Sequence, residues 1–447
     1  MIKTKIQKIF LISILINIFS FGSQEKFVIR IQNPDEGLFF KYRAPEYDMP
    51  AYKPGEYLDL VVNTNLYEEI IEEGHSVLIM QTEAELRQNL RGVRDLYGYR
   101  NYEDVLTELQ DIAEQYPDIC QLVDLGDTWG KEYADDGENY YSDFYHEVWG
   151  LKVSDNVEID EDEPGTFFMG MHHSREPISV EVVMGILYHL LNNYDTDPNI
   201  TGIVNNTQIW FVPIVNPNGH QIVTEEIDLW WRKNIRDNNE NGQFDTSNDY
   251  GYGTDGVDPN RNYGFQYGEV GTSNSFNSPV YHGPNAWSEP ENVAMKNLLE
   301  SNHFVTGITY HSYSELVLFP FGYEMGVSAP DHDALEELAV EMAVTIPAQG
   351  GGHYTPQQSL ELYPCMGTTD DYAYGVHTIF SFTIELGTQF IPPAGQIDQI
   401  VEDNLEAAMI LLNRINQKTL TGHLTNSETG EPITAEIYVE GIDNTGN

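Results

Sequence analysis

Apolar segments recur at short intervals along most of this 447-residue chain, and their order constrains the fold more than any other feature. Between residues 102 and 386, segments typical of buried strands alternate with segments that have the spacing of amphipathic helices. Such alternation is typical of an α/β domain, in which helices cover both faces of one sheet. The segments are Tyr102–Gln115, Val148–Val153, Thr166–Met171, Val180–Leu191, Gln208–Val215, Val293–Leu299, Val305–His311 and Ile379–Leu386.

The first 22 residues have the composition of a secretory signal peptide. Three lysines precede the apolar run Ile9–Phe21, and small residues follow at Ser20–Gly22. An uncleaved anchor is the alternative, but this run is shorter than the about 20 residues that span a bilayer. We therefore predict a secreted protein, extracellular or periplasmic, that has no membrane contact after residues 1–22 are removed.

Two smaller units flank the predicted α/β domain, which we place at residues 99–417. Residues 23–98 alternate short strands with helices and end in a cluster of arginines. Residues 418–447 contain short apolar stretches separated by turn residues, which predicts the start of a truncated β domain. The elements expected in residues 23–98 are strands at Leu58–Val62 and Ser76–Gln81 and helices at Leu66–Glu73 and Glu83–Asn89, and the arginines are Arg87, Arg91, Arg94 and Arg100.

The charge balance excludes one large class of function. The chain has 22 Lys and Arg against 71 Asp and Glu, a formal net charge of −49. Nucleic-acid binding needs a basic surface, so we predict no nucleic-acid partner. Hydrophobic residues make up 40% of the chain, which is enough for a core and argues against disorder. The two cysteines, Cys120 and Cys365, permit one disulfide at most, and the sequence leaves open whether they pair.

A histidine and an acid stand three residues apart in His173-Ser174-Arg175-Glu176. This stretch directly follows the predicted strand at 166–171 and precedes a helix that begins near Ser179. Strand-to-helix junctions at the carboxyl end of a sheet are where α/β proteins bind ligands. Imidazole and carboxylate are both zinc donors, and a catalytic zinc needs three protein ligands and one open position. We interpret His172 as a neighbour on the other side of the strand.

Two further strands end in residues of the same chemical types. His311 closes the segment 306–311, where a hydrogen-bonded core histidine is the alternative interpretation. Glu385 closes the segment 380–385, in which apolar residues alternate with small polar ones, so Glu385 falls on the polar face. A carboxylate at the end of a buried strand is costly unless it has a partner or a function. His311 is therefore a candidate third zinc ligand, and Glu385 a candidate catalytic acid.

Arginines are rare in the predicted α/β domain, and several of them lie within motif-like stretches. Three of them lie in His173–Glu176, in Leu229-Trp230-Trp231-Arg232-Lys233 and in Asp258-Pro259-Asn260-Arg261-Asn262. In so acidic a chain, each could simply be paired with a carboxylate. The functional alternative is a cluster that captures an anionic end group, for which the planar guanidinium is suited.

Together these motifs resemble the zinc carboxypeptidases of the pancreatic A/B type. HSRE, LWWRK, DPNRN, YHGP with WSEPE, TYHSYSELVLFPFG and SFTIEL occur in the family's order over about residues 102–416. The resemblance implies a mixed, mainly parallel, twisted sheet with helices on both faces. It also implies that residues 23–98 stand where an activation segment lies, and that residues 418–447 begin a transthyretin-like β-sandwich. The expected activity is zinc-dependent hydrolysis of the C-terminal bond of peptides or proteins.

The resemblance assigns the catalytic roles residue by residue. Glu385 matches the general base that takes a proton from the zinc-bound water, and Arg232 matches the residue that stabilises the oxyanion. Asp258 matches an acid that orients a zinc-bound histidine. The implied zinc ligands are His173, Glu176 and His311, and the implied substrate-binding residues are Arg175, Asn260, Arg261 and Tyr363.

The segment Tyr363–Tyr374 matches the family's specificity loop without gaps. In this register Asp371 matches an acid common in the family, and Asp370 falls at the base of the side-chain pocket. Members that prefer Lys or Arg carry Asp at that position, because a desolvated carboxylate needs a cation. The resemblance therefore implies a carboxypeptidase B-like preference for C-terminal Lys and Arg, with a solvated loop acid as the alternative interpretation of Asp370.

One departure from the family resembles a calcium loop. Oxygen donors alternate at Asp237, Asn239 and Asn241, then Gly242 follows, and Asp245 supplies a further carboxylate. The Glu expected at the twelfth position is absent, because Asn248 stands there. Calcium binding and a plain turn are therefore both open, and Ca²⁺ is predicted only as a second metal beside Zn²⁺.

Two other functions fit parts of the pattern. A zinc- or peptide-binding module that has lost catalysis would be expected to lack Glu385 or a zinc ligand, and all of these are present. A same-fold hydrolase of cell-wall peptides or acylated amino acids would often lack the pair Asn260 and Arg261, which is also present. We further predict that residues 23–98 are an inhibitory segment removed near the arginine cluster 87–100, which we expect to be an exposed basic stretch. The oligomeric state is not predicted.

Overall fold

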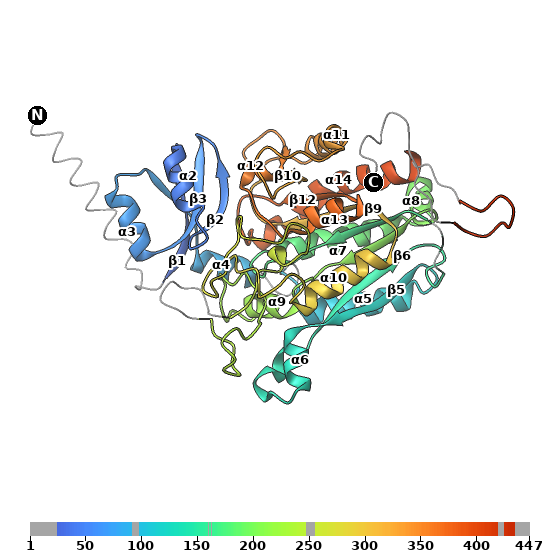
Figure 1. The fold of residues 1–447 in the computed structure, drawn as a ribbon, viewed down its shortest axis with the longest axis horizontal. Coiled ribbons are helices and arrows are strands. Elements are labelled where there is room, and N and C mark those ends of the chain that lie inside the picture. Colours follow the sequence, from blue (N-terminus) through green and yellow to red (C-terminus); the bar gives the residue numbers. More distant parts are fainter. Residues whose placement is uncertain are drawn as a thin grey trace, which may run out of the picture.

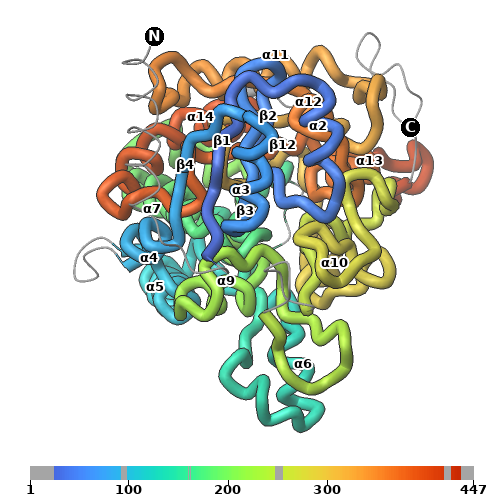
Figure 2. The backbone as a smooth tube through the Cα atoms, turned by 90° about the vertical axis from the view of Figure 1, so that its left-hand side faces the viewer, coloured from blue at the N-terminus to red at the C-terminus, as the bar shows by residue number. Residues whose placement is uncertain are grey.

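The computed structural model describes residues 25–91, 98–159, 161, 163–246, 255–418 and 424–433. These residues form a small N-terminal domain that lies against one side of a large α/β domain (Figure 1). Viewed from that side, the strands of the small domain lie in front of the large one (Figure 2). The predicted signal peptide and most of the predicted C-terminal β unit lie outside the described residues, and in the short stretch 424–433 Thr425 pairs with Pro432.

The N-terminal domain is a four-stranded antiparallel sheet in the order β2-β3-β1-β4. Its core contains Phe27, Ile29, Leu58, Leu60 and Ile70, all of which are buried. The structure confirms the predicted strands and helices in residues 58–89 and adds three elements before them. The elements are β1 (Lys26–Gln32), α2 (Glu36–Tyr42), β2 (Asp48–Lys53), β3 (Tyr57–Asn63), α3 (Thr64–Glu72), β4 (Val77–Thr82) and α4 (Glu83–Arg91).

The large domain contains an eight-stranded sheet in the order β11-β10-β12-β9-β7-β8-β6-β5. Its central pairs β12–β9, β9–β7 and β7–β8 are parallel, whereas β5, β6 and β10 run antiparallel to neighbours. The predicted mixed, mainly parallel α/β sheet is therefore confirmed. The strands are β5 (Cys120–Asp127), β6 (Glu147–Val153), β7 (Gly165–Met169), β8 (Gln208–Val212), β9 (Phe304–His311), β10 (Leu316–Phe319), β11 (Thr355–Gln358) and β12 (Phe380–Glu385).

Helices cover both faces of this sheet, and the side-chain alternation of β7 shows why. Phe168 enters the core on one face, whereas Phe167 and Met169 enter the core on the other. The first core is closed by α5, α7, α8, α9, α11 and α14, and the second by α10 and α13. These helices are α5 (Tyr102–Gln115), α7 (Ile178–Asn193), α8 (Pro198–Val204), α9 (Pro217–Thr224), α10 (Pro290–Ser301), α11 (His332–Ala343), α13 (Thr369–His377) and α14 (Ile397–Lys418).

Three neighbouring parallel strands bring their carboxyl ends to one edge of the sheet. In the register of β9 and β12, His311 pairs with Glu385. On the other side of β9, Thr309 pairs with Met169 at the end of β7. The predicted motifs that follow β7, β9 and β12 therefore meet at this edge, which the N-terminal domain covers (Figure 1).

Three smaller features complete the fold. The insertion after β5 folds as α6 (Trp129–Asp135) and a short 3-10 helix at Asn139–Phe144, which project from the large domain (Figure 1). Cys120 and Cys365 are both buried and are not bonded to each other. Within the described residues, no helix combines the length and the apolar character needed to cross a bilayer.

Candidate active site

His173, Glu176 and His311 come together at the edge where β7 and β9 end. Their donor atoms all lie within 4.8 Å of one another, and all three residues are buried. His173 Nδ1 lies 2.9 Å from Glu176 Oε1, and His311 Nδ1 lies 2.9 Å from Glu176 Oε2. The two Nδ1 atoms are only 3.1 Å apart. Two imidazole nitrogens and a carboxylate thus converge on one point.

The chemistry of this donor set fits Zn²⁺. Asp258 Oδ1 lies 3.2 Å from His173 Nε2 and accepts a hydrogen bond from it, so a neutral His173 presents the Nδ1 lone pair to the centre of the triad. Facing lone pairs and an ionised carboxylate need a cation between them, and N and O donors of this kind suit zinc.

Arg232 lies beside the triad and is held by Asp258. Its Nε donates to Asp258 Oδ2 at 2.9 Å, and its Nη1 is 3.9 Å from Glu176 Oε1. Burial opposes ionisation of Asp258, but Arg232 and His173 outweigh it and keep the pKa of that carboxyl well below its usual range. Asp258 therefore fixes both the orientation of His173 and the position of a buried guanidinium.

Glu385 ends β12 directly beside His311. It lines the same small cavity as His173 and His311, and no Lys or Arg nitrogen of the described residues lies within salt-bridge distance of it. Desolvation raises the pKa of Glu385 to about 8. A carboxyl group with a raised pKa at such a position can exchange a proton near neutral pH, which suits a general acid–base.

Asn260, Arg261 and Tyr363 line the same cavity. Asn260 Oδ1 accepts hydrogen bonds from the backbone and hydroxyl of Thr369 at 2.9 and 3.0 Å, so its side chain is fixed. The Nη1 of Arg261 donates to its neighbour's carbonyl, and its Nε donates to Gly271 O. Its other terminal nitrogen makes none of these bonds, so a guanidinium donor stays available for an anionic group.

Asp370 also reaches this cavity, from the first turn of α13. Its carboxylate is 4% exposed, and its Oδ2 accepts a hydrogen bond from Ser359 Oγ at 2.9 Å. No Lys or Arg of the described residues forms a salt bridge with it. The neighbouring Asp371 is turned elsewhere and accepts from Gly322 N. The cavity holds about 40 Å³ and is lined by His173, Asn260, Arg261, His311, Leu318, Ser359, Leu362, Tyr363, Cys365, Thr368, Asp370, Thr383 and Glu385.

Arg175 does not line the cavity, although it stands between two residues of the triad. Its guanidinium is fully buried, donates to Asp48 Oδ1 at 2.8 Å and lies over the ring of Phe390. Asp48 belongs to β2 of the N-terminal domain. Above the site, a cleft of about 370 Å³ remains between the two domains, and Arg232 and Tyr363 both reach it.

The loop predicted to bind calcium lies apart from this site. The oxygens of Asp237, Asn239 and Asn241 accept hydrogen bonds from backbone N–H groups within the loop. The carboxylate of Asp245 accepts from the side-chain amides of Asn239 and Asn241. These bonds describe a closed turn, and calcium binding stays a prediction.

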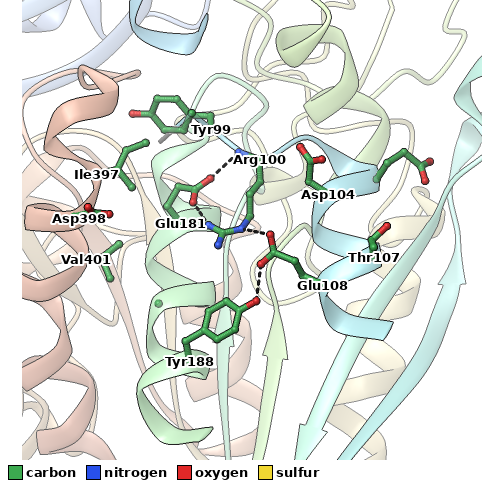
Figure 3. Close-up of a pocket in the computed structure, with 13 residues that line it drawn as sticks. Tyr99, Arg100, Asp104, Thr107, Glu108, Glu181, Tyr188, Ile397, Asp398 and Val401 are labelled. Atoms are coloured by element: carbon green, nitrogen blue, oxygen red, sulfur yellow. Dashed lines mark hydrogen bonds and ion pairs between the residues drawn. The ribbon is translucent and has the colours of Figure 1, made fainter. Parts of the chain in front are cut away.

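A larger cavity lies elsewhere, between α5, α7 and α14 (Figure 3). It holds about 660 Å³ and contains Arg100, which we had predicted to be an exposed part of a basic stretch. That expectation is wrong for Arg100, because its side chain is 26% exposed and is ion-paired with Glu181 and Glu108. Tyr188 donates to Glu108 at 2.7 Å. The ion pairs with these two acids hold the guanidinium of Arg100 inside the cavity.

Three contributors to the site were missed in the sequence. Ser359 and Thr368 line the cavity beside Asp370, and Asp48 binds Arg175 from the other domain. Thr368 lies inside the specificity loop, so its position in the motif offered a signal. Nothing in the sequence signalled Asp48, which is 127 residues away from its partner.

Comparisons with known proteins agree with this geometry. The sequence profile described as "Zinc carboxypeptidase" matches residues 105–407, about two thirds of the chain. A zinc carboxypeptidase of Saccharothrix mutabilis subsp. capreolus is 32% identical over 297 residues, which cover 65% of this chain and 62% of that protein. The alignment thus spans less than two thirds of that relative. A carboxypeptidase B of Astacus astacus is 28% identical over 327 residues, which cover 71% of this chain and 97% of that protein.

Among solved structures, the carboxypeptidase A of Helicoverpa armigera has the same fold. Its TM-score is 0.74 at 20% sequence identity, and the match covers 88% of this chain and 98% of that one. Residues 99–447 alone cannot supply 88% of this chain, so the likeness in fold extends into the N-terminal domain.

Proposed function

This chain belongs to the zinc carboxypeptidase family and is a metallocarboxypeptidase, and we propose that it is a secreted enzyme that removes C-terminal Lys and Arg from peptides and proteins. The expected reaction comes from the family, and the expected substrate comes from the residues that line the cavity of this chain. Secretion rests on the composition of residues 1–22. The N-terminal sequence of protein recovered from the culture medium tests it, and a chain that retains residues 1–22 contradicts it.

His173, Glu176 and His311 would hold Zn²⁺, which supplies the Lewis acidity that activates water and polarises the scissile carbonyl. Glu385 takes the proton of the attacking water and passes it to the leaving amine. Arg232 donates to the carbonyl oxygen as negative charge develops there, and its link to Asp258 keeps it oriented.

The terminal carboxylate of the substrate is held by Asn260, Arg261 and Tyr363. Arg261 offers a charge-assisted donor in a cavity from which bulk water is largely excluded. A free α-carboxylate therefore binds there better than an internal peptide bond does. This requirement confines cleavage to the last peptide bond.

The observation that carries the proposed specificity is the buried carboxylate of Asp370. It shares a cavity with His173, His311 and Glu385, and it has no cationic partner among the described residues. An uncompensated buried carboxylate is costly, and a substrate Lys or Arg would remove that cost. An apolar side chain would leave it unpaired.

The test uses protein folded as the full chain, loaded with zinc and then treated with trypsin to open the interdomain segment. The substrates are blocked dipeptides that differ only in the C-terminal residue: Lys, Arg, Leu or Phe. We expect kcat/KM to be at least about 100-fold higher for the best basic residue than for Phe. Cleavage of Phe equal to or better than that of both basic residues contradicts the specificity, and equal rates on amidated C-termini contradict the carboxylate role.

We also propose that the N-terminal domain inhibits the enzyme until it is removed. Asp48 occupies Arg175, and Asp59 accepts a hydrogen bond at 2.8 Å from Tyr313, two residues after the ligand His311. The amides of Gln81 and Asn89 donate to Ile391 O. Since Arg100 is fixed within the large domain, cleavage would fall before Tyr99, whose hydroxyl donates to Pro392 O.

Activity on a long peptide before and after trypsin treatment tests inhibition. We expect a rise of at least tenfold, and Asp48→Ala should raise the activity of the uncut chain while leaving that of the cut protein unchanged. Equal activity of cut and uncut protein contradicts inhibition. A mature N-terminus after Arg100 contradicts the site of cleavage.

A further inference from the structure

We propose that Thr368 is a specificity-determining residue that makes the enzyme prefer C-terminal Lys to Arg. The inference rests on the proposed function, because it concerns the cavity in which Asp370 would receive a basic side chain. The carboxylate of Asp370 would favour either basic residue, whereas the present inference narrows the preferred C-terminal residue to Lys.

The hydroxyl of Thr368 is buried in this cavity without a partner. Thr368 is 4% exposed, lines the cavity, and its Oγ1 has no hydrogen-bond partner among the described residues. The residue is the N-cap of α13, a position at which a threonine hydroxyl ordinarily accepts a bond from the first turn. Here the side chain makes no such bond. The hydroxyl is therefore available to form a hydrogen bond with a substrate side chain that enters the cavity.

Ser359 leaves the same cavity short of donors. Its Oγ lies 2.9 Å from Asp370 Oδ2 and 3.0 Å from Phe319 O, but a hydroxyl carries only one proton for these two acceptors. Together with the hydroxyl of Thr368, oxygen atoms of three residues face a cavity that contains no Lys or Arg bound to Asp370. A ligand that supplies several donors would satisfy them.

An ammonium group matches this arrangement better than a guanidinium does. Ammonium directs three donors outward from a single nitrogen, so it can reach oxygens contributed by different residues. A guanidinium is planar and is best matched by two oxygens of one carboxylate. Here one of the two carboxylate oxygens of Asp370 already accepts a hydrogen bond from Ser359, so fewer of its lone pairs are left for a bidentate pair.

The size of the cavity acts in the same direction. Its volume of about 40 Å³ has room for about three water molecules. Leu318, Leu362 and Cys365 form further walls of the cavity. Because the end of a lysine side chain is a single nitrogen and that of arginine is a three-branched plane, the narrow space favours lysine.

The test compares Thr368→Val with the unmodified protein, both folded as the full chain, zinc-loaded and trypsin-treated. Blocked dipeptides ending in Lys, Arg and Phe are the substrates. We expect the unmodified enzyme to prefer Lys to Arg by about tenfold. The variant, which keeps the shape but loses the hydroxyl, should lose about 10- to 100-fold in kcat/KM for Lys and less than threefold for Arg. Thr368→Ser should retain the preference.

Thr383→Val is the matched control. It removes a hydroxyl from the same cavity, but one that already pairs with Thr309 Oγ1 at 3.0 Å, so the Lys-to-Arg ratio should stay at its unmodified value. A ratio of one or less in the unmodified enzyme overturns the inference and leaves the proposed basic specificity standing. An unchanged ratio in Thr368→Val also overturns it. Preference for Phe over both basic residues overturns the proposed specificity itself.

Discussion

Two polar cavities of the large domain differ in how their charges are compensated. In the larger, about 660 Å³, Arg100 binds both Glu181 and Glu108, and Tyr188 donates to Glu108 (Figure 3). In the smaller, about 40 Å³, Glu385 and Asp370 have no ion-pair partner among the described residues. The volumes alone would point to the wrong cavity.

The candidate active site thus differs from the other cavity in holding carboxylates that no Lys or Arg of the described residues compensates. A folded chain ordinarily satisfies its buried polar atoms, and departures from this rule need an explanation. The hydroxyl of Thr368 is such a departure, and the carboxylates of Glu385 and Asp370 have no cationic partner among the described residues. All three residues line the cavity at the edge where β9 and β12 end. The paired acids around Arg100 have a structural explanation already, because they fasten residues 98–100 to α5 and α7.

The largest expected effect comes from Glu385→Gln. The change keeps the shape of the side chain but removes the proton acceptor, so turnover should fall by at least about 10³-fold. Zinc content, measured by atomic absorption, should stay at one equivalent. Glu181→Gln in the other cavity is the control and should retain kcat. A Glu385→Gln protein with more than a few per cent of the activity would place the general base elsewhere.

The next largest effect is expected from Asp370 in the smaller cavity. Asp370→Ala removes the buried carboxylate, and kcat/KM for C-terminal Arg should fall by roughly 30- to several thousand-fold. Asp398→Ala, in the larger cavity, removes an exposed carboxylate and should leave this value unchanged. Retention of the Arg rate in Asp370→Ala would mean that Asp370 is an ordinary buried acid.

Much of the candidate active site was predictable from the sequence, because β9 and β12 are apolar runs closed by His311 and Glu385 and the motif His173–Glu176 follows β7. Local patterns identify strand ends, and parallel strands end at one edge. Strand β2 was missed because Pro50 is untypical of a strand, and β11 because it contains Pro356 and polar residues. The partner of Arg175 depends on how two domains pack, and no local pattern encodes that.

A smaller effect, on stability alone, should follow from Arg100→Met. Glu181 is 2% exposed, and without its partner it becomes an unpaired buried charge. The free energy of unfolding in urea should fall by about 3 kcal/mol, while kcat/KM of the folded protein changes less than twofold. Arg91→Met, whose side chain is 64% exposed in its pair with Glu226, should cost much less. A loss of activity in Arg100→Met would mean that the larger cavity takes part in function.

The smallest expected effect concerns the buried acid Glu291. Burial beside Glu289 raises the pKa of Glu291 to about 8, from an ordinary value of 4.5. The folded state therefore binds a proton that the unfolded state has lost between these values, so this group's contribution to stability is full below pH 4.5 and disappears as pH rises to 8. Glu291→Gln should flatten the decline of the melting temperature over this range. An identical decline in both proteins would show that Glu291 is already ionised in the fold.

One measurement tests the central claim, that the uncompensated groups at the strand ends form a single catalytic zinc site. Metal is removed from the trypsin-treated protein with a chelator, and activity on a blocked dipeptide ending in Lys is followed as Zn²⁺ is added back. The account predicts no activity in the metal-free protein and a linear recovery that ends at one equivalent, with no recovery in His173→Ala. Activity that survives complete removal of the metal, or full recovery in His173→Ala, would contradict it.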